Sequence, residues 1–85
     1  MVSVRQIKAG RALLGWSQSD LANESGVSEP TIARLESTDG DLGGREATAK
    51  KIRSALERGG IQFIEENGGG PGVRLRKADK KKSPK

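Results

Sequence analysis

The side chains best suited to molecular recognition lie close together in the sequence, between Gln18 and Glu36. An amide (Gln18), a carboxylate (Glu29) and a guanidinium (Arg34) can each form directional hydrogen bonds with a polar partner. Catalysis is a weaker interpretation, because the chain has no cysteine and no histidine and its acids form no inward-facing pair that the sequence reveals. We therefore expect no enzyme activity, no catalytic residue, no metal site and no cofactor.

Two short helices joined by one tight turn are expected to position these side chains. Ser17 and Asp20 approximate a capping box that opens the first helix, and Gly26 ends it. Ser28 caps the second helix, where Pro30 is tolerated in the first turn. A short turn with a central glycine makes the two helices cross steeply, which is the helix-turn-helix geometry. The outer edge of such a pair can reach into a DNA major groove.

The same stretch resembles the phage-repressor type helix-turn-helix of the Xre and Cro/C1 family of bacterial transcription regulators. The resemblance is carried by Gln18, the Leu21 and Ala22 pair, the GVS turn at 26–28 and the TIARLE run at 31–36. It extends over residues 4–59. It implies a mainly α fold, a repressor-like helix-turn-helix bundle of about four helices. The pattern of the C-terminal segment, which lies outside the resemblance, predicts an additional β-hairpin.

The resemblance also implies which positions contact DNA. These are Gln18, Ser28, Glu29, Pro30, Thr31, Ala33 and Arg34. A solvated helix face without a ligand is the alternative, because these positions carry no signature of their own. Arg34 suits bidentate pairing with a guanine, and Glu29 either accepts from a cytosine amino group or pairs with Arg34. Gln18 orients a phosphate or Arg34, or is simply solvated.

A structural ion pair is expected between the first helix and the end of the recognition helix. Apolar residues recur at helical spacing from Val4 to Leu14, and Arg11 falls on this inward stripe. A charge there is costly unless it is paired. The resemblance implies that the partner of Arg11 is Glu36, and neither residue is expected to be catalytic.

The segment after the last predicted helix (45–58) has the pattern of a β-hairpin. Extended residues from 61 to 66 are followed by a glycine-rich turn and then by alternating apolar and basic residues. An isolated two-stranded hairpin is marginal in water, so it must pack on its own helices, pair with the hairpin of a second protomer, or both. Four apolar residues that share one face are assigned to dimerisation: Ile61, Phe63, Val73 and Leu75.

Length and charge define the rest of the prediction. A chain of 85 residues with one Trp, one Phe and no Tyr forms one small domain with a thin core, and association into a homodimer is expected. Residues 1–70 contain nine Lys or Arg and ten Asp or Glu, whereas residues 71–85 contain seven and one. We divide the chain into a helix-turn-helix domain (1–60), a hairpin (61–77) and a disordered basic tail (78–85). The tail either contacts DNA non-specifically or only aids solubility.

These expectations combine into a sequence-specific regulator that binds double-stranded DNA. It would bind a pseudo-palindromic operator as a homodimer, and the resemblance implies control of transcription, most simply repression. The lack of a long apolar run and of a signal-peptide pattern predicts a cytoplasmic protein without membrane contact. The alternative is a protein-interaction module, such as an antitoxin or anti-activator that binds a toxin or regulator protein. The near-neutral body and Glu29 favour this alternative, whereas the preserved helix-turn-helix and the basic tail oppose it.

Overall fold

Four helices and one β-hairpin make up the computed structural model, which describes residues 3–38, 46–65 and 68–76. The elements in chain order are α1 (Val4–Leu14), α2 (Gln18–Ser25), α3 (Glu29–Glu36), α4 (Glu46–Arg58), β1 (Ile61–Ile64) and β2 (Gly72–Leu75). The predicted fold class, a helix-turn-helix bundle with a C-terminal hairpin, is confirmed. The predicted tail lies outside the described residues.

Local capping chemistry fixes the helix boundaries that the sequence predicts. The Ser17 hydroxyl accepts from the Asp20 amide while the Asp20 carboxylate accepts from the Ser17 amide, so the capping box of α2 is complete. Gly26 ends α2 with φ 79°, a left-handed conformation that costs glycine little. Ser28 then caps α3 by accepting from the Thr31 amide. The turn between α2 and α3 is therefore bounded by Gly26 at the end of α2 and by Ser28 at the start of α3.

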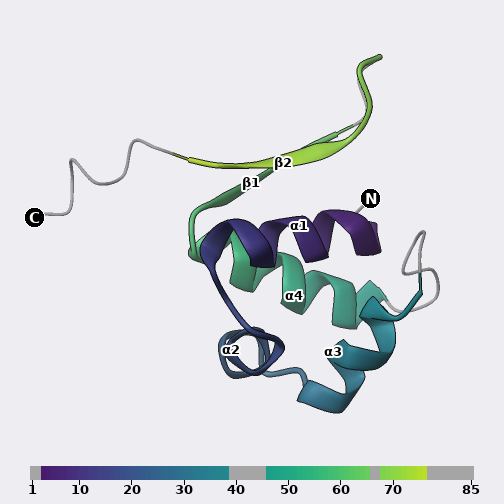
Figure 1. Cartoon of the computed structure of the whole chain (residues 1–85), viewed down its shortest axis with the longest axis vertical. Helices are drawn as coiled ribbons and strands as arrows, with labels where there is room; N and C mark the ends of the chain where they lie inside the picture. Colours follow the sequence, from purple (N-terminus) through teal and green to yellow (C-terminus); the bar gives the residue numbers. More distant parts are fainter. Residues whose placement is uncertain (1–2, 39–45, 66–67, 77–85) are drawn as a thin grey trace, which may run out of the picture.

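The elements form three levels, which Figure 1 shows from one side. The hairpin lies along one side of α1 and α4, and α2 and α3 lie on the opposite side. β1 and β2 pair antiparallel, with Ile61 opposite Leu75 and Phe63 opposite Val73. The hairpin is thus separated from α3 by the level of α1 and α4.

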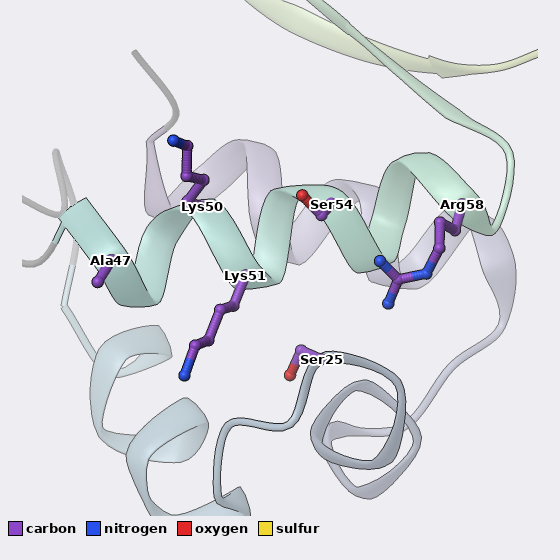
Figure 2. Close-up of a pocket in the computed structure, with 6 residues that line it drawn as sticks. All are labelled: Ser25, Ala47, Lys50, Lys51, Ser54 and Arg58. Carbon is purple, nitrogen blue, oxygen red and sulfur yellow. The ribbon is translucent and has the colours of Figure 1, made fainter.

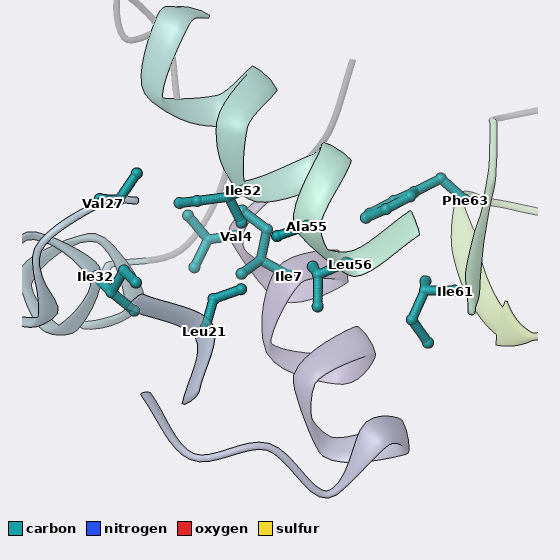
Figure 3. Packing of buried hydrophobic residues seen from close by; sticks show 10 residues of the cluster. All are labelled: Val4, Ile7, Leu21, Val27, Ile32, Ile52, Ala55, Leu56, Ile61 and Phe63. Carbon is teal, nitrogen blue, oxygen red and sulfur yellow. The ribbon is translucent and has the colours of Figure 1, made fainter. Parts of the chain in front are cut away.

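One apolar core joins all of these levels (Figure 3). Leu21, Ile32 and Leu56 are fully buried, and burial of such a side chain contributes roughly 1.5–3 kcal/mol. The hairpin shares this core, because Ile61 is also fully buried and Phe63 is nearly so. No helix in the described part of the chain is long and apolar enough to cross a membrane.

Candidate nucleic-acid interface

Helix α3 has one buried face and one exposed face. Ile32 and Glu36 are buried, and Leu35 is partly buried against the core. The opposite side carries most of the residues predicted to contact DNA: Glu29, Pro30, Ala33 and Arg34 are all exposed. Two turns of helix therefore present an acid, a guanidinium and two small apolar groups outward from a fixed core.

The N-terminal end of α3 is organised by Ser28 and Thr31. The Ser28 hydroxyl accepts from the Thr31 amide at 3.4 Å and donates to Thr31 Oγ1 at 2.9 Å. Pro30 lies in the first turn, where its missing N–H is not needed by the helix. Ser28 is exposed and Thr31 is partly exposed, so both remain accessible beside the positive end of the helix dipole.

A buried polar cluster supports α3 from its inner side. Glu36 accepts from Arg11 through both carboxylate oxygens, at 3.0 Å from Nε and 2.7 Å from Nη2. Arg11 also donates to the Trp16 carbonyl at 3.0 Å, and the side-chain amide of Gln18 donates to Glu36 at 3.1 Å. A bidentate pair of this kind has little orientational freedom. The cluster therefore ties α1, the link to α2, the start of α2 and the end of α3 together.

The charge state of this cluster follows from its contacts. Burial by itself raises the pKa of Glu36, but hydrogen bonds from Arg11 and Gln18 and attraction to Arg11 and Lys8 outweigh it, so that pKa lies below its ordinary value. The hydrogen bond to Glu36 raises the pKa of Arg11. Both groups are therefore charged at neutral pH, and the Glu36 carboxylate acts as a fixed acceptor.

The structure answers two questions that the sequence left open about Gln18 and Glu29. The Gln18 amide faces Glu36, and among the described residues no hydrogen bond joins it to Arg34. No ion pair links Glu29 to Arg34 within the described ranges either. Of the alternatives given above for Gln18 and Glu29, a contact with Arg34 is therefore not the one seen among the described residues. Both Glu29 and Arg34 point outward from α3 without a described polar partner for their side chains.

A family comparison agrees with this geometry. A model of the helix-turn-helix family matches residues 7–57, which is more than half of the chain. The chain belongs to the phage-repressor type helix-turn-helix family. It is therefore a DNA-binding helix-turn-helix protein of a transcription regulator family, and that family is not typically enzymatic. No curated protein matches the sequence.

Outside the helix-turn-helix, a shallow hollow lies between α4 and the end of α2 (Figure 2). Its lining consists of Ser25, Ala47, Lys50, Lys51, Ser54 and Arg58. Figure 2 shows Lys51 and Arg58 pointing from α4 toward the α2 end, and Lys50 pointing away from it. Arg58 donates to the Glu24 carbonyl at 2.7 Å, so it satisfies a carbonyl of the last turn of α2. This lining has no acid, and within it Arg58 links α4 to the last turn of α2.

The four residues predicted to form a dimer face have different environments. Ile61 and Phe63 are buried among the protein's own helices, Val73 is partly buried, and Leu75 is 49% exposed. The hairpin therefore packs on its own helices through both strands, while the apolar side chain of Leu75 remains half-exposed.

Sequence reasoning did not foresee the role of Gln6 in holding the hairpin. Its side chain is buried, accepts from the Ser3 amide at 2.9 Å and donates to the carbonyls of Gly72 at 3.0 Å and Ile64 at 3.4 Å. The capping box with Ser3 was predictable from the sequence. The contacts with both strands join residues far apart in the chain, and no local pattern indicates them.

Proposed function

We propose that this protein is a sequence-specific regulator of transcription, acting as a repressor, that inserts α3 into the DNA major groove. The proposal rests on one observation: α3 presents an exposed row of side chains while its inner face is fixed by the core and by Arg11, Glu36 and Gln18. A recognition element needs rigid placement, because base contacts depend on hydrogen-bond geometry. The helix-turn-helix domain corresponds to residues 1–60, as the sequence predicts.

Within this proposal, the residues of α3 have separate tasks. Arg34 reads a guanine through its two guanidinium nitrogens, and Glu29 accepts from a cytosine amino group. Pro30, Thr31 and Ala33 contribute apolar contacts to the groove, and Ser28 contacts the backbone near the helix start. Gln18 keeps Glu36 in place from the start of α2, and so acts on DNA binding through the position of α3.

We further propose that two copies bind a pseudo-palindromic operator together, with the hairpin (61–77) as the dimer element. Repressor domains of this geometry place one recognition helix in each half-site, about one helical turn of DNA apart. A single small helix covers few base pairs, so joining two half-sites raises affinity without any new contact. Val73 and Leu75 are the members of the predicted dimer face that are not fully buried in one protomer, which is consistent with a second copy docking there. The basic tail (78–85) would add affinity for DNA without sequence preference.

The experiment that tests this function starts from DNA of random sequence. Repeated selection of duplexes bound by the wild-type protein should enrich an inverted repeat with a fixed centre-to-centre spacing. Repression is then tested by placing the selected site over a reporter promoter. Enrichment of no sequence would contradict the proposal. That result would instead support a protein-interaction role, which the family match does not favour.

A further inference from the structure

The outer edge of β2 is available for pairing. In an antiparallel hairpin, successive residues turn their backbone groups alternately toward the partner strand and away from it. The Arg76 amide donates to the Gly60 carbonyl at 2.8 Å, so Arg74, two residues before it, also faces β1. Val73 and Leu75 must then turn their backbone groups to the outer edge. In the described part of the chain the sheet consists of β1 and β2 alone, so nothing described pairs with this edge.

Two exposed leucines border the same edge. Leu75 is 49% exposed and Leu13 is 47% exposed, and they are the large hydrophobic residues that the described structure leaves in solvent. Gly10 packs against Ile61, with the Ile61 Cγ2 atom 3.5 Å from the place where a Cβ would stand. Gln6 on α1 donates to the Gly72 carbonyl of β2, and Leu13, about two helical turns later, lies on that side of α1. Since Leu75 is paired with Ile61, both leucines lie near the C-terminal end of α1, on the β2 side.

The edge of β1 has a different character. Arg53 on α4 forms ion pairs with Glu57 at 3.0 Å and with Glu65 at 3.8 Å. Its guanidinium also lies 5.1 Å from the centre of the Phe63 ring. Charged side chains next to a strand edge oppose pairing with a second chain. The two edges of the hairpin therefore differ. On the side that faces the helices, β2 carries the apolar Val73 and Leu75, whereas its Arg74 lies on the opposite face and donates to Gln62 Oε1 at 2.9 Å.

From these observations we propose that a second copy of this chain pairs along the outer edge of β2, antiparallel, giving a four-stranded sheet in the order β1, β2, β2, β1. Leu75 and Leu13 of each protomer would be covered at this junction. The inference rests on the proposed homodimer and specifies which edge forms it. An interface of this kind is isologous, because the same patch is used by both copies.

The position of α3 gives this arrangement a functional consequence. The helices cover one side of the hairpin, and α3 lies beyond α1 and α4 on that side (Figure 1). In edge-to-edge antiparallel pairing the two-fold axis is perpendicular to the sheet, so the covered sides of both hairpins face the same way. Both recognition helices then face one duplex, as an operator with two half-sites requires. Packing the hairpins face to face would direct the two recognition helices in opposite directions.

The test uses three variants of the full chain, examined by sedimentation equilibrium at micromolar concentration. Leu75→Pro removes an outward-facing amide, so the bonds between β1 and β2 are retained while edge pairing is blocked. Leu13→Glu places a charge at the junction on a helix surface that needs no apolar residue for folding. Ala47→Glu is the control, because Ala47 is exposed on α4 away from this edge.

We expect a wild-type dimer, a monomeric Leu75→Pro variant with wild-type circular dichroism, and dimerisation weakened about tenfold or more by Leu13→Glu. Ala47→Glu should remain dimeric. A wild-type dimer that survives both Leu75→Pro and Leu13→Glu would overturn the assignment of the edge while leaving the homodimer itself intact. A wild-type monomer, both free and on the selected DNA, would overturn the dimer together with the edge. Sequence-specific binding by that monomer would still support the DNA-binding function.

Discussion

Two arginine clusters in this molecule have the same chemistry and different surroundings. Arg11 binds Glu36 between the helices of the helix-turn-helix, where their side chains are 21% and 5% exposed. Arg53 binds Glu57 on the surface between α4 and the hairpin, where the exposed fractions are 34% and 42%. The first pair is shielded from water and the second competes with it. Because both pairs join an arginine to a glutamate, we expect the difference in burial, and not the charges, to decide how much free energy of unfolding is lost when each pair is broken.

The largest effect should come from breaking the buried pair. Arg11→Ala or Glu36→Ala leaves the remaining charge in a largely buried place, and each should cost about 3 kcal/mol of unfolding free energy. Urea denaturation followed by circular dichroism measures this. The double variant Arg11→Met with Glu36→Leu is the control, since it leaves no unpaired charge and should recover part of the loss. Single variants as stable as the wild type would contradict the structural role of the pair.

The second-largest effect should be a loss of folding stability at acidic pH, caused by protonation of Glu36 in the buried cluster. The pKa of Glu36 is lower in the folded chain than in the unfolded chain, so its contribution to stability is complete above the unfolded value of about 4.3. That contribution is lost as pH falls through the folded pKa. Melting curves of the wild type and Glu36→Gln at several pH values test this. The stability difference between them should shrink below about pH 4, and a constant difference would mean that Glu36 does not titrate in this way.

Breaking the exposed cluster around Arg53 should cause the smallest loss of unfolding free energy. Replacing Arg53 with Met keeps the apolar stem and removes the ion pairs with Glu57 and Glu65, and the expected loss is below about 1 kcal/mol. Thermal melting in low and high salt is the measurement, because salt should reduce even this small difference. A loss as large as that of Arg11→Ala would show that exposure is the wrong criterion for separating the two clusters.

The features of the fold that could be predicted from the sequence are those that depend on residues close together in the chain. Helix boundaries depend on local chemistry, and the capping serines at 17 and 28 and the glycine at 26 were sufficient to predict them. The helix-turn-helix followed from the spacing of these residues. The hairpin was predicted from alternation. β1 ends at Ile64, before the predicted limit at residue 66, and β2 begins and ends one residue earlier than the alternating run 73–76.

Contacts between distant segments were not predictable in this way. The Gln6 side chain reaches Gly72 across 66 positions of sequence, and nothing in the pattern near either residue indicates it. The partner of Gln18 was also missed, because a glutamine at the start of a helix has several possible acceptors and only the folded chain brings Glu36 close. Periodicity placed Ile61, Phe63, Val73 and Leu75 on one face, but how far each is buried depends on where α1 and α4 lie.

The central claim, that the outer face of α3 reads DNA, is tested most directly by comparing Arg34→Ala with Arg74→Ala in binding to the selected operator. Both variants remove one exposed arginine, and Arg74 lies on the hairpin, on the other side of α1 and α4 from α3 (Figure 1). Arg34→Ala should weaken specific binding by about 1–3 kcal/mol with an unchanged melting temperature, because a base contact is lost. Arg74→Ala should change it far less, because the Arg74 side chain donates to Gln62 within its own hairpin and its removal leaves the outward-facing backbone groups of Val73 and Leu75 in place. Equal losses for the two variants, or no loss for Arg34→Ala, would contradict the account.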